Sequence, residues 1–326
     1  MTSCTSLQFD SAALGHVWKQ LLDSRNQGSV FLTPQWQQTW WEQFGDSSKD
    51  LMLFLIGEEA EPLGLAPMMR EDSTISFLGS TDLFDYHDVI LGRGEPGAFY
   101  HGLVACLKSE TWQTLSLESV PGDSPTLQYL PDIFRQDGYA VSVEQEDVVP
   151  GLHLPPTWDD YLAGLRKKDR HELRRKMRRL DESAAARMVR SSGETLSDDI
   201  DLFLDMMRES REEKRDFLIP ERETFFRATV QRMYDEGFLR LLFLEVDGER
   251  VAGVVCFDYA GRRFLYNSGF RSAYGNLSVG LMLKTFCLRE AIEEGLEYFD
   301  FLRGPEAYKY HLGAKDADIY RVIVHR

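Results

Sequence analysis

The chain has 326 residues, of which 43% are hydrophobic and 12% aromatic, and this is enough apolar mass for two hydrophobic cores. A formal net charge of −16 argues against nonspecific nucleic-acid binding, so we expect no DNA partner. No apolar run reaches the roughly 18 to 20 residues of a membrane-spanning helix, and the polar segment Met1–Asp10 lacks the features of a secretory signal. We therefore expect a cytoplasmic protein without a transmembrane segment.

The first half of the chain reads as a small α/β region. Thr33-Pro34 predicts a helix start with Thr as N-cap, and Gly45 predicts its end. Within this helix Trp36, Trp40 and Phe44 recur every four residues, which is typical of a core-facing stripe. The strands expected next are Leu51–Ile56, Leu63–Met69, Thr74–Leu78 and His87–Leu91; a helix at Phe99–Ser109 and strands at Thr114–Ser119 and Tyr139–Glu144 complete this half.

Two acids, a phenol and an imidazole occupy four consecutive residues, Asp85-Tyr86-His87-Asp88, at the expected entry of a strand. Alternate residues of a strand face the same side, so Tyr86 and Asp88 would share one face and His87 would point to the other. This density of polar groups suggests a binding site. A polar turn, in which the Asp side chains cap backbone N–H groups, is the alternative.

The second half opens on helical patterns. Thr157-Trp158-Asp159-Asp160 has the Thr-x-x-acid pattern of a capped helix. Further helices are expected at Ser197–Arg215 and at Glu221–Glu236, the latter ended by Gly237.

A strongly basic segment lies between these helices, since nine of the fourteen residues of Arg166–Arg179 are Lys or Arg. Its apolar residues fall at helical spacing and predict one narrow packing face: Leu165, Leu173, Met177 and Leu180. The other faces indicate either a solvated helix balanced by acidic neighbours or a wall that faces an anionic ligand.

The last third has the clearest order of elements. A hairpin with an Asp247-Gly248 turn is followed by a turn at Gly261-Arg262. The expected elements are strands at Leu239–Val246, Arg250–Tyr259 and Phe264–Phe270, a helix at Leu277–Glu294, and a strand at Tyr298–Gly304.

The start of that last helix is a candidate anion site. Its first N–H groups lack intrahelical partners, and the positive end of the helix dipole lies behind them. Ser278, Val279 and Gly280 open the helix, and Arg271 precedes them, so a phosphate or pyrophosphate suits this place. The alternative is an ordinary Ser N-cap beside a tight loop.

Three antiparallel strands, a helix and a parallel strand resemble the acetyl-CoA-dependent N-acyltransferase (GNAT) fold, in which this helix holds the cofactor pyrophosphate. Only part of that fold's usual Arg/Gln-x-x-Gly-x-Gly/Ala loop is present, as Arg271, Tyr274, Gly275 and Gly280. The segment 294–304 followed by Glu306-Ala307-Tyr308-Lys309 is similar to the tandem branch of the superfamily, the acyltransferases associated with cellulose biosynthesis and related to the Fem peptidoglycan-bridge transferases. Phe31–Trp41, Asp85–Asp88 and Arg166–Leu180 also match that branch. Because related transferases carry a similar basic helix at the start of the second domain, the resemblance favours a role near the cleft for Arg170, Arg174 and Arg175.

The resemblance implies an α/β (α+β) protein of two GNAT-like lobes, each a mixed, mostly antiparallel sheet flanked by helices. Residues 1–150 would form the acceptor side or a degenerate lobe, and residues 151–326 the acyl-CoA-binding lobe. The hairpins agree, because Leu53-Phe54-Leu55 and Leu242-Phe243-Leu244 align at an offset that also brings Gly64 onto Gly253.

The implied reaction moves an acyl group from acetyl-CoA or another acyl-CoA to an amine, such as an amino sugar or a nucleotide-linked amine, in a cleft between the lobes. The cofactor-binding residues would be Arg271, Ser278, Val279 and Gly280. The substrate-binding residues would be Tyr86, His87, Asp88, Arg170, Arg174 and Arg303.

Acyl transfer to an amine requires a base for the ammonium proton, donors for the oxyanion and a proton for the leaving thiolate. We expect Asp300 to orient the amine or accept its proton, with an ion pair to Arg303 or Lys309 as the alternative. Lys309 could neutralise an anionic substrate group or the oxyanion, and Tyr308 or Tyr310 could protonate the thiolate. Asp300, Lys309 and Tyr308 are therefore the predicted catalytic residues.

Other chemistries have less support. The four cysteines, Cys4, Cys106, Cys256 and Cys287, lie far apart and are interpreted as reduced core residues. The seven histidines show no metal-ligand spacing, so we expect no metal. A rival function is Fem-like aminoacyl transfer from charged tRNA to a cell-wall precursor, which the acidic balance and the lack of a long helical-arm insertion disfavour. A noncatalytic GNAT-fold binding protein is the other alternative. The sequence does not indicate an oligomeric state.

Overall fold

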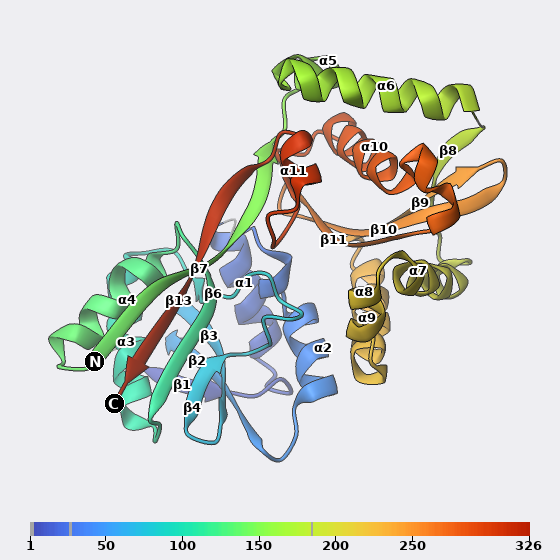
Figure 1. The fold of residues 1–326 in the computed structure, drawn as a ribbon. Helices are drawn as coiled ribbons and strands as arrows, with labels where there is room; N and C mark the ends of the chain where they lie inside the picture. The colour runs from blue at the N-terminus through green and yellow to red at the C-terminus, as the bar shows by residue number, and fades with distance from the viewer. Residues whose placement is uncertain (1–2, 26–27, 184) are drawn as a thin grey trace. The chain divides into compact units, whose positions relative to one another are not determined.

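The computed structural model describes residues 3–25, 28–183 and 185–326, and the chain divides into two units. The first contains Met1–Val148 and Ala317–Arg326, and the second contains Val149–Asp316 (Figure 1). The predicted division placed the end of the chain in the second lobe. Residues 317–326 belong to the first unit because their strand pairs there.

The sheet of the first unit is mostly antiparallel. Its first four strands are neighbours in chain order: β1 (Cys4–Leu7), β2 (Lys49–Gly57), β3 (Pro62–Glu71) and β4 (Thr74–Phe77). β6 (Thr114–Pro121) then pairs with β4 in parallel, and β13 (Lys315–His325) pairs with β6 antiparallel. The short β5 (Ile90–Leu91) pairs with β3.

Helices cover this sheet: α1 (Leu14–Arg25), the 3-10 turn η1 (Val30–Leu32), α2 (Pro34–Phe44), α3 (Pro96–Ser109) and α4 (Pro125–Gln136). α2 begins as predicted, since the Thr33 hydroxyl accepts a hydrogen bond from the Trp36 N–H at 3.4 Å. Trp36 and Trp40 are 0% and 4% exposed, which confirms their core role. A hydrophobic core joins α3 and α4 to one face of the sheet.

The second unit repeats this strand order. β8 (Ala186–Arg190), β9 (Leu239–Val246), β10 (Glu249–Tyr259) and β11 (Arg262–Phe270) are antiparallel neighbours, and β12 (Tyr298–Asp300) lies parallel to β11. The end of β7 (Ala140–His153) pairs with β12. Asp247 and Gly248 have φ of 50° and 87°, the left-handed geometry that the predicted Asp-Gly hairpin turn requires.

Helices cover both faces of this second sheet (Figure 1). On one side lie α5 (Trp158–Gly164), α6 (Lys167–Ser183) and α10 (Val279–Glu293), with α11 (Ala307–His311) beside β12; on the other lie α7 (Leu196–Ser210), α8 (Glu212–Phe217) and α9 (Pro220–Asp235). A 3-10 turn, η2 (Ser272–Leu277), joins β11 to α10. The predicted apolar face of the basic helix is confirmed, because Leu173 and Leu180 are buried in the core with α10. Among the described residues, none of the helices is long and apolar enough to cross a bilayer.

Three predicted elements differ from the structure. The helix expected at Ser197–Arg215 is two helices, α7 and α8, because Arg211 is extended at φ −159° and ψ 146°. The strand expected at Tyr298–Gly304 ends at Asp300, since Leu302 and Gly304 take positive φ values of 59° and 101° that turn the chain. The strand expected at His87–Leu91 is reduced to β5, so residues 85–88 lie in a loop and the predicted alternation of their side chains does not apply.

The cysteine prediction is wrong for one pair. Cys4 on β1 and Cys106 on α3 form a disulfide, with 6.4 Å between their Cα atoms. The two residues are 102 positions apart, and the fold of the first unit brings α3 against β1. Cys256 and Cys287 in the second unit are buried free thiols, as predicted.

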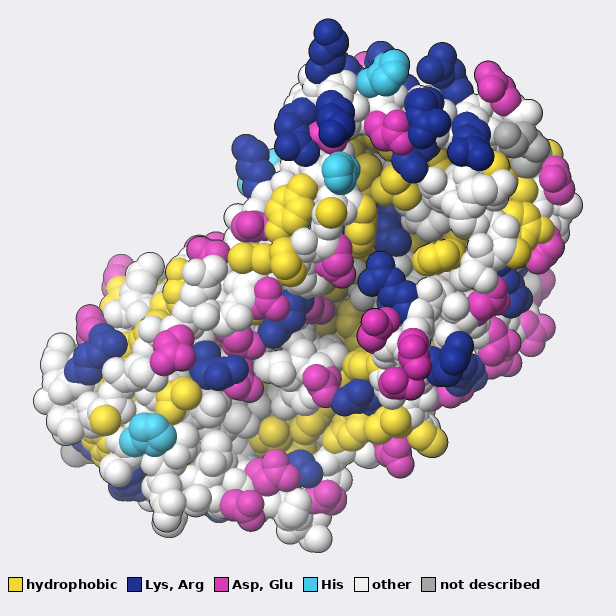
Figure 2. All heavy atoms as spheres, viewed as in Figure 1, with side chains coloured by type: hydrophobic (Ala, Val, Ile, Leu, Met, Phe, Trp, Pro, Cys, Tyr) yellow, Lys and Arg dark blue, Asp and Glu magenta, His cyan; other side chains and the backbone are white. Residues whose placement is uncertain are grey.

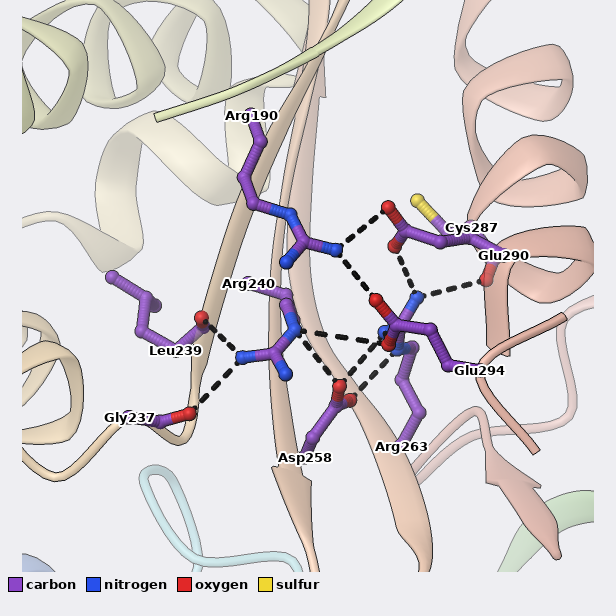
Figure 3. A network of polar contacts seen from close by, with 9 residues as sticks. All are labelled: Arg190, Gly237, Leu239, Arg240, Asp258, Arg263, Cys287, Glu290 and Glu294. Carbon is purple, nitrogen blue, oxygen red and sulfur yellow. Dashed lines mark hydrogen bonds and ion pairs between the residues drawn. The ribbon is translucent and has the colours of Figure 1, made fainter. Parts of the chain in front are cut away.

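A network of ion pairs fixes α10 to its sheet (Figure 3). At its centre is Arg263 on β11, which is 0% exposed and pairs with Asp258 at 2.7 Å, Glu290 at 2.6 Å and Glu294 at 2.8 Å. Arg190 on β8 contacts the same two glutamates of α10 from the other side. The C-terminal half of α10 is therefore held by charge as well as by apolar packing, and this fixes the direction in which its N-terminus points.

Candidate active site

The sheet of the second unit opens where β11 and β12 part. Their parallel pairing ends with Phe264 opposite Asp300. Past this point β11 continues to Phe270, whereas the chain after β12 turns into the loop that leads to α11. Backbone N–H and C=O groups need partners, so the open edge of β11 offers hydrogen bonds to side chains or to a ligand.

Two predicted catalytic residues hold the loop after β12. The carboxylate of Asp300, which is 1% exposed, accepts a hydrogen bond from the Leu302 N–H at 2.8 Å. The ammonium of Lys309, which is 2% exposed, donates to three loop carbonyls at 2.7 to 2.9 Å and pairs with Glu306 at 2.8 Å. These contacts make both residues positioning groups for the loop, and their predicted part in the chemistry stays a prediction. Arg303, a predicted substrate residue, lies partly buried in the same loop.

Tyr308, the third predicted catalytic residue, lies on α11 beneath a lysine that the sequence analysis did not select. Lys284 on α10 places its Nζ 4.9 Å from the centre of the Tyr308 ring. Burial lowers the pKa of Lys284 to about 8, with a further contribution from the nearby Arg211 charge. Burial raises the pKa of the Tyr308 phenol, so this group keeps its proton at neutral pH.

Lys214 on α8 is a second lysine that sequence reasoning missed. Its Nζ donates to Asn267 Oδ1 at 2.8 Å and to the backbone oxygen of Ser268, both on the part of β11 beyond the pairing with β12. Burial, followed by the charges of Lys284 and Arg211, lowers the pKa of Lys214 to about 7. The sequence around it, Arg-Glu-Glu-Lys-Arg, is typical of a solvated helix and contains no signal for this environment.

The predicted anion site lies at the start of α10. Ser278 has the N-cap position but takes a left-handed conformation, φ 56° and ψ 36°, and makes no side-chain cap. Its hydroxyl instead accepts a hydrogen bond at 2.8 Å from Lys176, which α6 supplies. Val279 and Gly280 follow as the first helical residues, so a lysine ammonium lies beside the positive end of the helix. Arg271, the other predicted cofactor residue, pairs with Glu209 at 2.9 Å.

A cavity of about 340 Å³ lies between α6, α10 and α11. Apolar and aromatic side chains form much of its wall. Lys176, which contacts the start of α10, and Tyr308, which lies beneath Lys284, also line it. Its lining residues are Asp169, Glu172, Leu173, Lys176, Leu281, Ala307, Tyr308, His311 and Leu312. Figure 2 shows Lys and Arg side chains gathered over α6, above a hollow whose walls carry hydrophobic side chains. This shape suits a ligand with an apolar body and an anionic end.

The arginines of the basic helix α6 make different contacts. Arg170 donates to the backbone oxygens of Leu162 at 3.3 Å and Ala163 at 3.0 Å, so it closes the C-terminus of α5. Arg175 forms two hydrogen bonds of 2.8 Å with Glu172, and these lower the pKa of Glu172 to about 2. Arg174 is exposed. The structure therefore assigns the contact with the start of α10 to Lys176, which the sequence analysis did not select.

The remaining predicted substrate residues belong to the first unit. His87 is 3% exposed and its ring stacks on Phe84, with 4.7 Å between ring centres. Asp88 accepts hydrogen bonds from the Thr126 hydroxyl at 2.6 Å and the Val89 N–H at 2.8 Å, and burial raises its pKa to about 6. The Tyr86 ring lies 6.1 Å from that of Phe31. These contacts support the loop conformation, and a role in substrate binding stays a prediction.

Comparison with known proteins agrees with this geometry. Residues 167–310 match the family "Acetyltransferase (GNAT) domain", so the second unit contains a GNAT-type acetyltransferase domain. No curated protein matches the chain in sequence. Among the described residues, no group of three or more His, Cys, Asp or Glu side chains could hold a metal ion.

Solved structures show the fold. FemX is similar with a TM-score of 0.63 and 12% identity, over 98% of this chain and 96% of FemX. The C-terminal domain (DUF2156) of a putative lysylphosphatidylglycerol synthetase from Agrobacterium fabrum has a TM-score of 0.59 and 10% identity, over 94% of this chain and 91% of that one. A tandem GNAT protein from the clavulanic acid biosynthesis pathway has a TM-score of 0.50 and 11% identity, over 99% and 98%. The predicted fold class, an α/β arrangement of GNAT-like lobes, is confirmed.

Proposed function

We propose that this protein transfers an acyl group from a coenzyme A thioester to an amine. The observation that carries the proposal is the open edge of β11 past Phe264, close in the chain to the start of α10 and inside a GNAT-type acetyltransferase domain. An extended thioester can lie along such an edge with its amide groups hydrogen bonded to the strand. Its pyrophosphate can then reach the helix start.

The donor would occupy the start of α10 and the cavity beneath α6. The N–H groups of Val279 and Gly280, together with the ammonium of Lys176, suit a pyrophosphate. The cavity of about 340 Å³, with its apolar wall, suits the acyl chain. Ser278 and Arg271 are proposed to join the donor site, Arg271 by exchanging its contact with Glu209 for a phosphate.

The chemistry would proceed by direct transfer. The amine nitrogen attacks the thioester carbonyl, N–H groups on the open edge of β11 stabilise the oxyanion, and the thiolate leaves with a proton. Tyr308 is proposed to supply that proton, because its phenol is protonated at neutral pH and the Lys284 ammonium over its ring would stabilise the phenolate that forms. Asp300 and Lys309 would hold the loop after β12, which contains Arg303 and beside which the amine would bind. The alternative is the direct role predicted from the sequence, in which Asp300 accepts the amine proton and Lys309 neutralises the oxyanion.

The acceptor would be an amine with an anionic part, such as an amino sugar or a nucleotide-linked precursor. The cationic side chains proposed to contact it are Arg174, Arg170 and Arg303. In the first unit the segment 86–88, with Tyr86, His87 and Asp88, is proposed as an acceptor-binding element, following its resemblance to the tandem branch associated with cellulose biosynthesis.

Aminoacyl transfer from charged tRNA is the second candidate. The exposed Lys and Arg side chains over α6 favour it, because a basic helix can follow a phosphate backbone (Figure 2). The net charge of −16 opposes it over the chain as a whole.

Thermal unfolding with coenzyme A, acetyl-CoA, a longer acyl-CoA and uncharged tRNA separates the two. A ligand at about 100 times its Kd adds roughly 2.7 kcal/mol of stability and raises the midpoint by several degrees. We expect a rise with the thioesters, and then release of free thiol when amines are added. A rise with tRNA alone would favour the second candidate, and no rise with any thioester at millimolar concentration would contradict the acyl-CoA proposal.

A further inference from the structure

The amine of Lys214 lies at the open edge of the second sheet with its donors occupied. Nζ donates to Asn267 Oδ1 at 2.8 Å and to the Ser268 carbonyl oxygen. A neutral lysine amine has two N–H bonds and one lone pair. Two acceptors therefore satisfy both N–H bonds and leave the lone pair available to take a proton from a ligand.

The charges around Lys214 favour its neutral form. The cations that face it are Lys284 from α10 and Arg211 at the start of α8, and the anion that faces it is Glu306 before α11. The Lys214 amine is partly buried, so water screens less of the repulsion between a positive charge on it and the charges of Lys284 and Arg211. Burial and these two cations lower its pKa to about 7, close to the pH at which a base must work.

We propose that Lys214 is the general base that takes the proton from the acceptor amine. This inference rests on the proposed acyl transfer and names a group that performs one of its steps. Lys214, from α8, reaches β11 beyond its pairing with β12, and Lys284, from α10, lies over the Tyr308 ring and acts on Lys214 by its charge.

An amine that binds as ammonium first loses one proton to solvent. As its nitrogen forms the new C–N bond, a second N–H proton passes to the lone pair of Lys214, and the C–S bond breaks. The thiolate takes a proton from Tyr308, and the phenolate then gains a proton from solvent while the Lys214 ammonium loses one to solvent. The products are an amide and free coenzyme A, and Lys214 is neutral again.

Lys284 has a separate task in this arrangement. Its ammonium lies over the Tyr308 ring, and its charge also acts on Lys214. A cation in this place disfavours a second charge on Lys214. Lys284 is therefore a positioning residue that acts through the base.

The pH dependence of kcat/KM tests the proposal with an acyl-CoA and an amine found by the thiol-release assay. For the wild-type protein we expect a loss of activity below about pH 7. Lys214→Arg keeps a cation but removes the base, and we expect a loss of about 100-fold or more and no limb near pH 7; only the limb set by the ionisation of the amine substrate itself remains. Lys284→Met removes a neighbouring cation, so the Lys214 pKa rises and the acid limb moves to higher pH.

Two further measurements separate chemistry from folding. Arg215→Gln changes an exposed residue on the same helix and should leave the profile unchanged. NMR of the protein after reductive ¹³C-methylation of its lysines should show one resonance that titrates near pH 7 and is missing from folded Lys214→Arg.

An acid limb near pH 7 that persists in Lys214→Arg, or the absence of a lysine resonance that titrates near neutrality, would overturn the assignment of the base and leave acyl transfer standing. Failure of every thioester to bind or react would overturn the proposed function, and the base would fall with it.

Discussion

The two units share one topology but differ at the helix that follows their fourth strand. In each unit four antiparallel strands lead to a helix, α3 or α10, and then to a strand that pairs with the fourth in parallel. α3 begins with Glu95 at its N-cap and Pro96 in its first turn, so it places a carboxylate beside the helix start and lacks one N–H donor. α10 begins with Ser278, Val279 and Gly280, and Lys176 lies beside it. The same topology thus places a cation beside this helix start in the second unit and a carboxylate beside it in the first.

The units also differ in what fills the region next to this helix. In the second unit, lysines with lowered pKa values approach the open edge of β11. In the first, Asp88 with a raised pKa is hydrogen bonded to Thr126 and Val89. Shared topology therefore does not indicate shared chemistry in the two units.

The largest expected effect concerns the cysteines, which form a disulfide in the first unit and free thiols in the second. Closing a loop of 102 residues stabilises a protein by about 4 to 5 kcal/mol in the chain-entropy model. Reductant should therefore lower the urea midpoint of the wild-type protein. A Cys4→Ser variant should already have the lower midpoint and should not respond.

Equal midpoints with and without reductant would remove this difference between the units. Disulfides are rare in cytosolic proteins, so the state of this pair in freshly isolated protein also tests the predicted cytoplasmic location.

The second effect concerns the loop after β12, which belongs to the second unit. Lys309→Met leaves three loop carbonyls and Glu306 without their buried cation. We expect a loss of about 3 to 5 kcal/mol in the free energy of unfolding, measured by urea titration. The matched control is Lys315→Met, an exposed position that should change stability by less than about 0.5 kcal/mol. Similar small losses for both would show that Lys309 is free for a catalytic role.

The third effect concerns pH and the first unit. The pKa of Asp88 is raised from 3.8 to about 6. At a pH between these two values the folded state therefore keeps a proton that the unfolded state has already lost. Stability should therefore fall as pH rises from about 4 to about 6, by at most about 3 kcal/mol, and change no further above that range. Asp88→Asn should abolish this dependence, whereas Glu59→Gln, at an exposed site, should retain it. A wild-type profile parallel to that of Asp88→Asn would contradict the raised pKa.

Local sequence signals account for the elements that were predicted correctly. The Asp247-Gly248 turn, the Thr33 cap and the apolar spacing of Leu173 and Leu180 all depend on residues close in the chain, and all three are present. The start of α10 was found for the same reason, because a helix start can be recognised from its own residues.

Features that depend on distant residues were missed. Lys214 obtains its environment from Asn267 and Lys284, and no pattern near Lys214 indicates them. The break at Arg211, which sets Lys214 on its own short helix, also lacked a Gly or Pro signal. The sequence also did not indicate which strand follows the parallel pair in each sheet. In the second unit β7 pairs with β12, whereas in the first unit β13, from the end of the chain, pairs with β6. Periodicity reports which face of an element is buried, and it does not report which partner covers that face.

The smallest expected effect tests the difference between the two helix starts directly. Lys176→Gln removes the ammonium beside Ser278 and keeps a side chain of similar length. We expect the Kd for coenzyme A, measured by calorimetry, to rise about 3- to 10-fold, which is on the order of 1 kcal/mol, and the difference to shrink as salt is added. Arg179→Gln, on an exposed position of the same helix, should have a smaller effect at low salt and none at high salt. Equal losses in the two variants would mean that α6 attracts the ligand by its overall charge. The start of α10 would then not differ from that of α3 in the way the structure indicates, and the donor site would have to be sought elsewhere along the open edge of β11.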